Sequence, residues 1–263
     1  MTETHDIQLH GLRTGYRTGH GTWRIVGEGL EATARHGKLT CVIGRNGTGK
    51  STLLRTVARL QPSAGGHVTA GGRPTATMTA TEMAREMSVV LTTRPTAQLI
   101  TVEETVALGR APYTGFWGRL TREDRIITRQ AMHSMGISHM AGRTLSSLSD
   151  GELQKTMIAK ALAQRTPCIL LDEPTAFLDF TGKIDLMMTM RQLAHDAGKT
   201  ILMSTHDLET ALRMADCIWL LDNNGIVSGT PASMASQGLI DRYIGKDFIT
   251  VDCDSLAISI GQP

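Results

Sequence analysis

Residues 44–51 of this chain read GRNGTGKS, and the fold can be inferred outward from this stretch. It matches the pattern G-x-x-x-x-G-K-S/T in full, and it lies between a short apolar run, Thr40–Ile43, and a helical pattern that begins at Ser51. The glycines let backbone N–H groups converge on phosphate oxygens, and the helix directs the positive end of its dipole to the same point. Strand, loop and helix therefore predict the start of a βαβ unit that binds phosphate, in preference to a merely structural glycine turn.

Two side chains at the end of the loop add chemistry of their own. Lys50 supplies a charge that can reach the β- and γ-phosphates, and Ser51 offers a hydroxyl to Mg²⁺, which takes few protein ligands. The residues expected to bind the nucleotide in this loop are Gly44, Asn46, Gly47, Thr48, Gly49, Lys50, Ser51 and Thr52.

A pair of adjacent acids follows a second apolar run, Cys168–Leu171. Side chains alternate along an extended chain, so one carboxylate can face a metal while its neighbour faces an attacking water. We assign Asp172 to Mg²⁺ and Glu173 to the general base. The alternative is a solvated strand end, which Pro174 disfavours because it stops the strand at this point.

The rest of the chain alternates between strand and helix patterns. Strands are expected at 87–91, 168–171, 200–203 and 217–221, and helices at 181–197 and 207–215, which predicts a mainly parallel sheet covered by helices. Residues 7–43 read as short strands broken by turns at Gly15, Gly19 and Gly21, and residues 100–164 read as an inserted helical lobe. Two further groups are assigned to buried helix faces: Leu53, Leu54, Val57 and Leu60, and the methionines of Met187–Met190.

Composition excludes several classes of protein. With 27 Lys and Arg against 25 Asp and Glu, the charge is too balanced to indicate nucleic-acid binding. The four cysteines form no C-x-x-C pair, which favours buried thiols in a reducing compartment over a disulfide or metal role. The N-terminus lacks the features of a secretory signal, and no run approaches the ~18 to 20 apolar residues that span a bilayer. We therefore expect a cytoplasmic protein.

Taken together, these motifs resemble the ATP-binding subunit of an ABC transporter, and the likeness covers nearly the whole chain. The resemblance implies an α/β P-loop NTPase with a mainly parallel sheet flanked by helices, an N-terminal antiparallel β region and an inserted helical subdomain. It also implies ATP and Mg²⁺ as cofactors, Tyr16 against adenine, and His206 in STHD on the γ-phosphate. Asp179, in PTAFLD, would line the seam between two copies of the chain.

The resemblance gives a role to the stretch LSDGE, residues 148–152. Two cassettes of this family pair head to tail, so Ser149, Gly151 and Glu152 of one copy would meet the γ-phosphate held by Lys50 of the other. A helix that starts here presents unpaired N–H groups and a partial positive charge, which suits an anion. Ser149 and Glu152 also fit a capping box, and the two roles are compatible.

Two positions depart from the family pattern. Asp150 stands where most members have glycine, and we expect its carboxylate to point away from the phosphate, into solvent or toward a basic neighbour. The Gln that usually touches Mg²⁺ after the strand ending at Leu91 is replaced by Thr92, whose hydroxyl has a shorter reach. Gln98, a few residues further on, is the alternative.

Residues 102–124 are similar to the corresponding region in importers of iron chelates, haem and cobalamin. Tyr113, Phe116 and Trp117 there are either a contact surface for the membrane subunit or part of the lobe's own packing. The implied partners are a second copy of the chain, transmembrane permease subunits that hold it on the inner face of the membrane, and a substrate-binding protein, with no nucleic acid. The rivals are a soluble ATPase clamp and a catalytically silent cassette.

We expect one ABC ATPase domain over residues 1–263. Its nucleotide-binding core would comprise about 1–91 and 165–225, its helical subdomain about 92–164, and its C-terminal extension about 226–263.

Overall fold

The strand that leads into the phosphate loop, β3 (Leu39–Ile43), lies inside a six-stranded sheet of order β10-β9-β3-β8-β7-β6. The structure, a computed structural model, describes residues 4–19, 21–92, 99–115, 117–222, 225–246 and 249–260. The other strands of the sheet are β6 (Met87–Val90), β7 (Cys168–Asp172), β8 (Thr200–Thr205), β9 (Cys217–Asp222) and β10 (Gly225–Gly229). Only β10 runs antiparallel to its neighbour, so the predicted mainly parallel sheet is confirmed.

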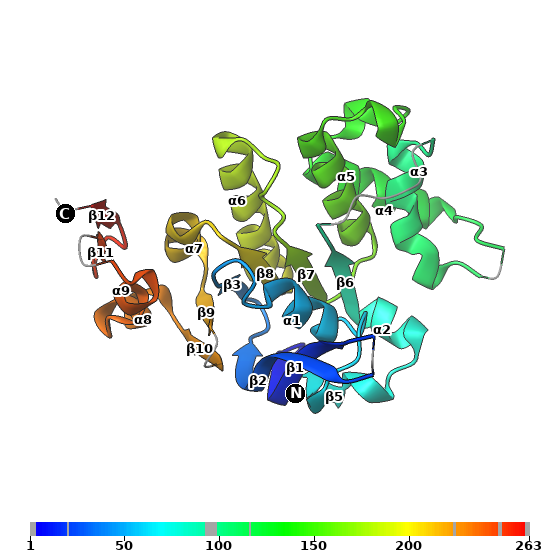
Figure 1. Cartoon of the computed structure of the whole chain (residues 1–263). Coiled ribbons are helices and arrows are strands. Elements are labelled where there is room, and N and C mark those ends of the chain that lie inside the picture. The colour runs from blue at the N-terminus through cyan, green and yellow to red at the C-terminus, as the bar shows by residue number, and fades with distance from the viewer. Residues whose placement is uncertain are drawn as a thin grey trace.

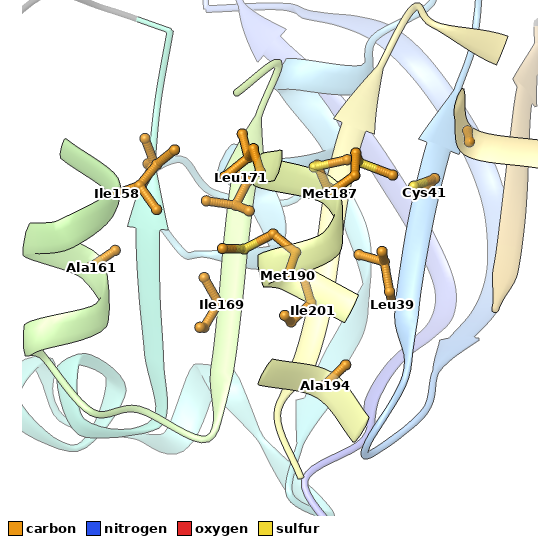
Figure 2. Close-up of a cluster of buried hydrophobic side chains, with 14 of the residues drawn as sticks. Leu39, Cys41, Ile158, Ala161, Ile169, Leu171, Met187, Met190, Ala194 and Ile201 are labelled. Carbon is orange, nitrogen blue, oxygen red and sulfur yellow. The ribbon is translucent and has the colours of Figure 1, made fainter. Parts of the chain in front are cut away.

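The central strands are apolar because both of their faces are covered. Every residue of β3, β7 and β8 is buried, and successive side chains point into two different hydrophobic layers. One layer lies under α6 (Phe180–Ala197), where Met187, Met190 and Ala194 pack over the sheet (Figure 2). The prediction that all three methionines are core is wrong for Met188, which is 59% exposed because it lies on the opposite side of the helix.

The second layer separates the sheet from α1 (Lys50–Val57) and from a four-stranded antiparallel sheet of order β2-β1-β4-β5. Its strands are β1 (Ile7–Arg17), β2 (Trp23–Ala34), β4 (Gly65–Ala70) and β5 (Arg73–Pro74). Two predictions are corrected here. Gly15 lies within β1, where a side chain would collide with the Arg24 carbonyl of β2, and Leu60 lies beyond α1 and is 57% exposed.

A helical lobe is inserted between β6 and β7, and it stands away from the antiparallel sheet and the C-terminal segment (Figure 1). Its elements are α3 (Val102–Ala107), η2 (Leu108–Tyr113), α4 (Arg122–Ser134), η3 (Ser138–Met140), η4 (Leu145–Ser147) and α5 (Asp150–Ala163). Buried side chains of α3, α4 and α5 join the same hydrophobic layer as α6. The lobe is therefore continuous with the core that positions the phosphate loop.

The remaining elements connect or extend these layers. They are η1 (Thr75–Thr77), α2 (Ala80–Glu86), α7 (Leu208–Met214), α8 (Pro231–Ser236), α9 (Leu239–Ile244), β11 (Ile249–Val251) and β12 (Ile258–Ile260). The last two pair as a small antiparallel hairpin that the sequence patterns did not predict. Across the described ranges, every helix is too short or too polar to traverse a lipid bilayer.

Candidate functional site

The phosphate loop leaves the buried end of β3 and turns directly into α1. Gly47 and Gly49 have φ angles of 84° and 97°, which lie in the left-handed region that favours glycine. A side chain at Gly49 would also collide with Val26 of β2. Gly49 caps α1 without a side-chain hydrogen bond, and the first turn of the helix holds no acid, so its N–H groups remain available to an anion.

Lys50 is the cation of this loop, and it is only 5% exposed. Its Nζ donates to the carbonyl oxygens of Gly44 at 2.8 Å and Arg45 at 3.4 Å, and it lies 3.7 Å from Glu173 Oε1. These contacts hold the ammonium group between the loop and the carboxylate assigned to the general base. The predicted phosphate cation and the predicted base are therefore neighbours in space.

Asp172 ends β7 fully buried, and its carboxylate receives three hydroxyl groups. Ser51 and Ser204 donate to Oδ1 at 3.0 and 2.8 Å, and Thr92 donates to Oδ2 at 3.4 Å. The three residues predicted as metal ligands, Ser51, Asp172 and Thr92, thus lie together. This set of oxygen atoms has the chemistry that Mg²⁺ prefers.

Glu173 follows with a φ angle of 47°, which is uncommon for a residue with a side chain. Its backbone N–H donates to Ser204 Oγ at 2.9 Å, and His206 Nδ1 lies 3.9 Å from Oε2. Ser204 comes from β8, where it is in register with Asp172. Sequence reasoning missed Ser204 because its role depends on which strand lies beside β7.

A cavity of about 530 Å³ opens beside the loop. It is lined by Tyr16, Arg24, Ile25, Val26, Asn46, Gly47, Gly49, Lys50, Ser51, Thr52 and Glu173. Among the predicted residues of this half of the site, Gly44, Thr48, Thr92, Asp172 and His206 are not in the lining. Gly44 and Asp172 lie directly behind it, as hydrogen-bond partners of Lys50 and Ser51.

Tyr16 brings an aromatic ring to the mouth of this cavity and is 46% exposed. Its cross-strand partner is Arg24, whose guanidinium carbon lies 5.8 Å from the ring centroid. Sequence reasoning missed Arg24 and Val26, because the register of β1 on β2 places them here.

The stretch LSDGE lies outside the cavity. Ser149 caps α5: its Oγ accepts from the Glu152 N–H at 3.3 Å, and Glu152 Oε2 accepts from the Ser149 N–H at 2.8 Å, so the expected capping box is present. The hydrogen bond from the Ser149 N–H, together with Arg143, holds the pKa of Glu152 below its usual value. Asp150 is exposed in the first turn.

Gly151 lies close to the turn that carries Asp179. A side chain at Gly151 would come within 3.3 Å of the Phe177 carbonyl oxygen, and Asp179 caps α6 by accepting from the Gly182 N–H at 2.9 Å. The chain therefore carries two separate groups of predicted nucleotide-binding residues. One lines the cavity, and the other is presented at the N-termini of α5 and α6.

Four of the predicted residues belong to the loop after β6 and to the aromatic segment. Gln98 and Phe116 lie outside the described residues. Tyr113 is 37% exposed and packs under Arg110, whose guanidinium carbon lies 4.1 Å from its ring centroid, whereas Trp117 is 81% exposed. Tyr113 therefore contributes to packing within the lobe, and Trp117 is presented at its surface.

The chain is similar in sequence to known proteins along most of its length. Residues 28–176 match the family described as ABC transporter. The ferric enterobactin transport ATP-binding protein FepC of Escherichia coli is 37% identical over 235 residues, which are 89% of this chain and 86% of the relative. The hemin import ATP-binding protein HmuV of Streptomyces coelicolor is 38% identical over 220 residues, which are 83% of this chain and 78% of the relative.

The fold is similar to solved structures as well. A bacterial ABC transporter cassette solved as a dimer superposes with a TM-score of 0.75 at 25% identity, covering 86% of this chain and 98% of the other.

Proposed function

Since the chain belongs to the ABC transporter family, we propose that it is the ATP-hydrolysing subunit of an importer for iron siderophores, haem or cobalamin. The observation that carries the proposal is the cavity in which Lys50, Ser51 and Glu173 converge beside the phosphate loop. The relatives named for ferric enterobactin and hemin support the iron-chelate part. Cobalamin rests on the sequence resemblance of residues 102–124.

In the mechanism we propose, Tyr16 stacks on adenine while Lys50 and the loop N–H groups hold the phosphates. Glu173 lies beside Lys50 and accepts a proton from the water that attacks the γ-phosphate in line. His206, near Glu173, hydrogen-bonds the γ-phosphate and orients that water. Catalysis then depends on positioning and on charge stabilisation, as expected for phosphoryl transfer.

The residues also fit a magnesium ion. Asp172, Ser51 and Thr92 would hold it, and their hydroxyl and carboxylate oxygens are already gathered at one point. Held by these residues, Mg²⁺ would supply positive charge that offsets the negative charge developing on the phosphate during hydrolysis. The carboxylate of Asp172 is prepared for this task because the Ser204 hydroxyl fixes one of its oxygens.

We further propose that two copies pair head to tail, so that the second group of residues completes the site. Ser149, Gly151 and Glu152 of one protomer would contact the γ-phosphate on the other, and Asp179 would line the seam. Their position outside the cavity of their own chain and the dimeric state of a cassette with the same fold support this arrangement. The helical subdomain at about 92–164 would carry LSDGE toward the partner.

The importer would also contain transmembrane permease subunits and a substrate-binding protein. The permease would hold this chain on the cytoplasmic face of the membrane, with Trp117 among the exposed groups of the helical lobe nearest to it. A soluble clamp is the weaker alternative, because FepC and HmuV are named for transport and import.

Replacing Glu173 by Gln tests the proposal. The variant should lose ATP turnover by a factor of about 100 or more, because the base is gone while nucleotide binding remains. An ATP-bound dimer should accumulate, as seen by light scattering after gel filtration. Glu28→Gln, which changes a 70% exposed carboxylate on β2, is the control and should turn over normally. Unchanged hydrolysis by Glu173→Gln would refute the assigned base.

A further inference from the structure

Arg143 contacts both Glu152 of the LSDGE stretch and Ser147, the residue just before that stretch. Its Nη1 lies 3.0 Å from Glu152 Oε1, its Nη2 donates to the Ser147 carbonyl, and its Nε donates to Ser147 Oγ at 3.4 Å. Arg143 lies between η3 and η4, so its side chain joins the loop before α5 to the first turn of that helix. The planar guanidinium group suits this forked arrangement.

The carboxylate that Arg143 contacts also controls the Ser149 hydroxyl. Glu152 Oε2 lies 2.8 Å from Ser149 N and 3.0 Å from Ser149 Oγ, while Oε1 faces Arg143. A serine hydroxyl has a single proton to donate, and in this arrangement it is directed at Glu152. A phosphate oxygen that approaches Ser149 must compete with this carboxylate for the proton.

Negative charge in the first turn of α5 would therefore oppose the binding of phosphate there. Asp150 and Glu152 both lie there, and an anion is favoured at a helix N-terminus only when nearby carboxylates do not cancel the effect of the dipole. Arg143 lies within ion-pair distance of Glu152, with its Nη1 3.0 Å from Oε1. At this exposed location the pair adds little to folding stability, so its contacts call for another explanation.

We propose that Arg143 is a positioning residue for the composite ATP site: it neutralises Glu152, and so weakens the hold of this carboxylate on the Ser149 hydroxyl when the partner's γ-phosphate competes for its proton. The inference rests on the proposed head-to-tail dimer. It assigns Arg143 an electrostatic task that acts through Glu152. The competing explanation is a purely mechanical brace, in which Arg143 matters because it holds the Ser147 carbonyl.

A double-mutant cycle between Arg143 and Glu152 separates these explanations. In the Glu173→Gln background, ATP-dependent dimerisation is followed by light scattering, and the midpoint ATP concentration is compared for Arg143→Ala, Glu152→Gln and the double variant. The uncompensated carboxylate should raise the midpoint about tenfold for Arg143→Ala at low salt, and less at high salt. With Glu152→Gln already present, adding Arg143→Ala should change the midpoint by less than about twofold.

Arg143→Lys supplies the matched control, because it keeps the charge but loses the fork. The midpoint ATP concentration of this variant should stay within about threefold of the parent value, since a lysine at this position can still neutralise Glu152. A brace would instead make Arg143→Lys as defective as Arg143→Ala and would leave the Arg143→Ala defect unchanged beside Glu152→Gln. Either result would overturn the inference.

The same series distinguishes this inference from the proposed function. If the Glu173→Gln parent never dimerises with ATP, the composite site and the role of Arg143 fail together. If the parent dimerises and the Arg143→Ala defect persists in the double variant, only the role of Arg143 is refuted. Thermal unfolding of each variant checks that the lobe remains folded.

Discussion

At the scale of single residues, Ser204 connects the carboxylate of Asp172 to the backbone of Glu173. One hydroxyl donates to Asp172 Oδ1 and accepts from the Glu173 N–H, and the side chain is completely buried. The Glu173 backbone lies in the left-handed region, which costs about 1 to 2 kcal/mol for a residue with a Cβ. Ser204 therefore stabilises a conformation that the chain would not otherwise favour.

Replacing Ser204 by Ala should lower kcat about tenfold with little change in KM, because the base loses its position while the phosphate loop is intact. Stopped-assay phosphate release at varied ATP gives both constants. Ser88→Ala is the matched control. Ser88 lies on β6, away from the cavity, and it is equally buried and accepts a hydrogen bond from Thr166 Oγ1 at 3.0 Å. Both variants should lower the melting temperature, and a normal kcat for Ser204→Ala would contradict the assigned role.

At the scale of elements, the helical lobe is held together by a buried ion pair between η2 and α4. Arg110 Nε donates to Asp124 Oδ1 at 2.9 Å, and Arg110 Nη1 donates to the Ala163 carbonyl at the end of α5. Asp124 also caps α4 with Thr121. The hydrogen bond from Thr121, together with that from Arg110, lowers the pKa of Asp124 from 3.8 to about 2.

Replacing Asp124 by Asn should lower the free energy of unfolding by about 3 kcal/mol, because Arg110 stays buried without its counter-charge. The depressed pKa means that Asp124 contributes its full stability above about pH 4, and that this contribution is lost as pH falls toward 2. Urea unfolding at several pH values should show this loss in the parent and a smaller loss in Asp124→Asn. Glu209→Gln, which breaks an exposed pair with Arg213, should change stability by less than about 0.5 kcal/mol.

Elements differed in how far the sequence predicted them, and burial explains the difference. Strands β3, β7 and β8 were predicted because strands covered on both faces are continuous apolar runs. Strand β4 was missed because it begins with Gly65-Gly66 and exposed residues, which read as a turn. The hairpin of β11 and β12 was missed for a similar reason, since each strand has three residues and little burial.

The residues of the site also differed in how far the sequence predicted them. Local motifs predicted Lys50, Ser51, Asp172 and Glu173, because these residues are adjacent to recognisable strands and loops. Strand order and register, which one sequence does not reveal, brought in Ser204 and Arg24.

At the scale of the whole molecule, the two groups of proposed nucleotide-binding residues are separate on one chain. The cavity lies between the phosphate loop and the antiparallel sheet, whereas Ser149 is presented by the helical lobe. A head-to-tail pair would bring the two groups together twice, by two-fold symmetry. Activity should then depend on which defects are combined in one dimer.

Mixing two inactive variants tests this dependence. Lys50→Ala damages the cavity side and Ser149→Arg damages the partner side, so a mixed dimer should retain one intact site. Random pairing should restore about a quarter of the parent ATPase activity. Lys50→Ala mixed with Glu173→Gln is the control, because both defects lie on the cavity side and no intact site can form. Failure of the first mixture to exceed the second would exclude a shared site.

Helix α5 connects the proposed nucleotide contact at its first turn with Arg110 at its last residue. Its first turn is the proposed contact for the partner's nucleotide, and the carbonyl of its last residue, Ala163, accepts from Arg110, on which Tyr113 packs. Fourteen residues of helix form a rod about 21 Å long, so a tilt of about 10° at one end displaces the other by about 4 Å. If the proposed contact forms, a tilt of α5 on the arrival or loss of one phosphate group would therefore shift the carbonyl of Ala163 and the Arg110 side chain that it holds.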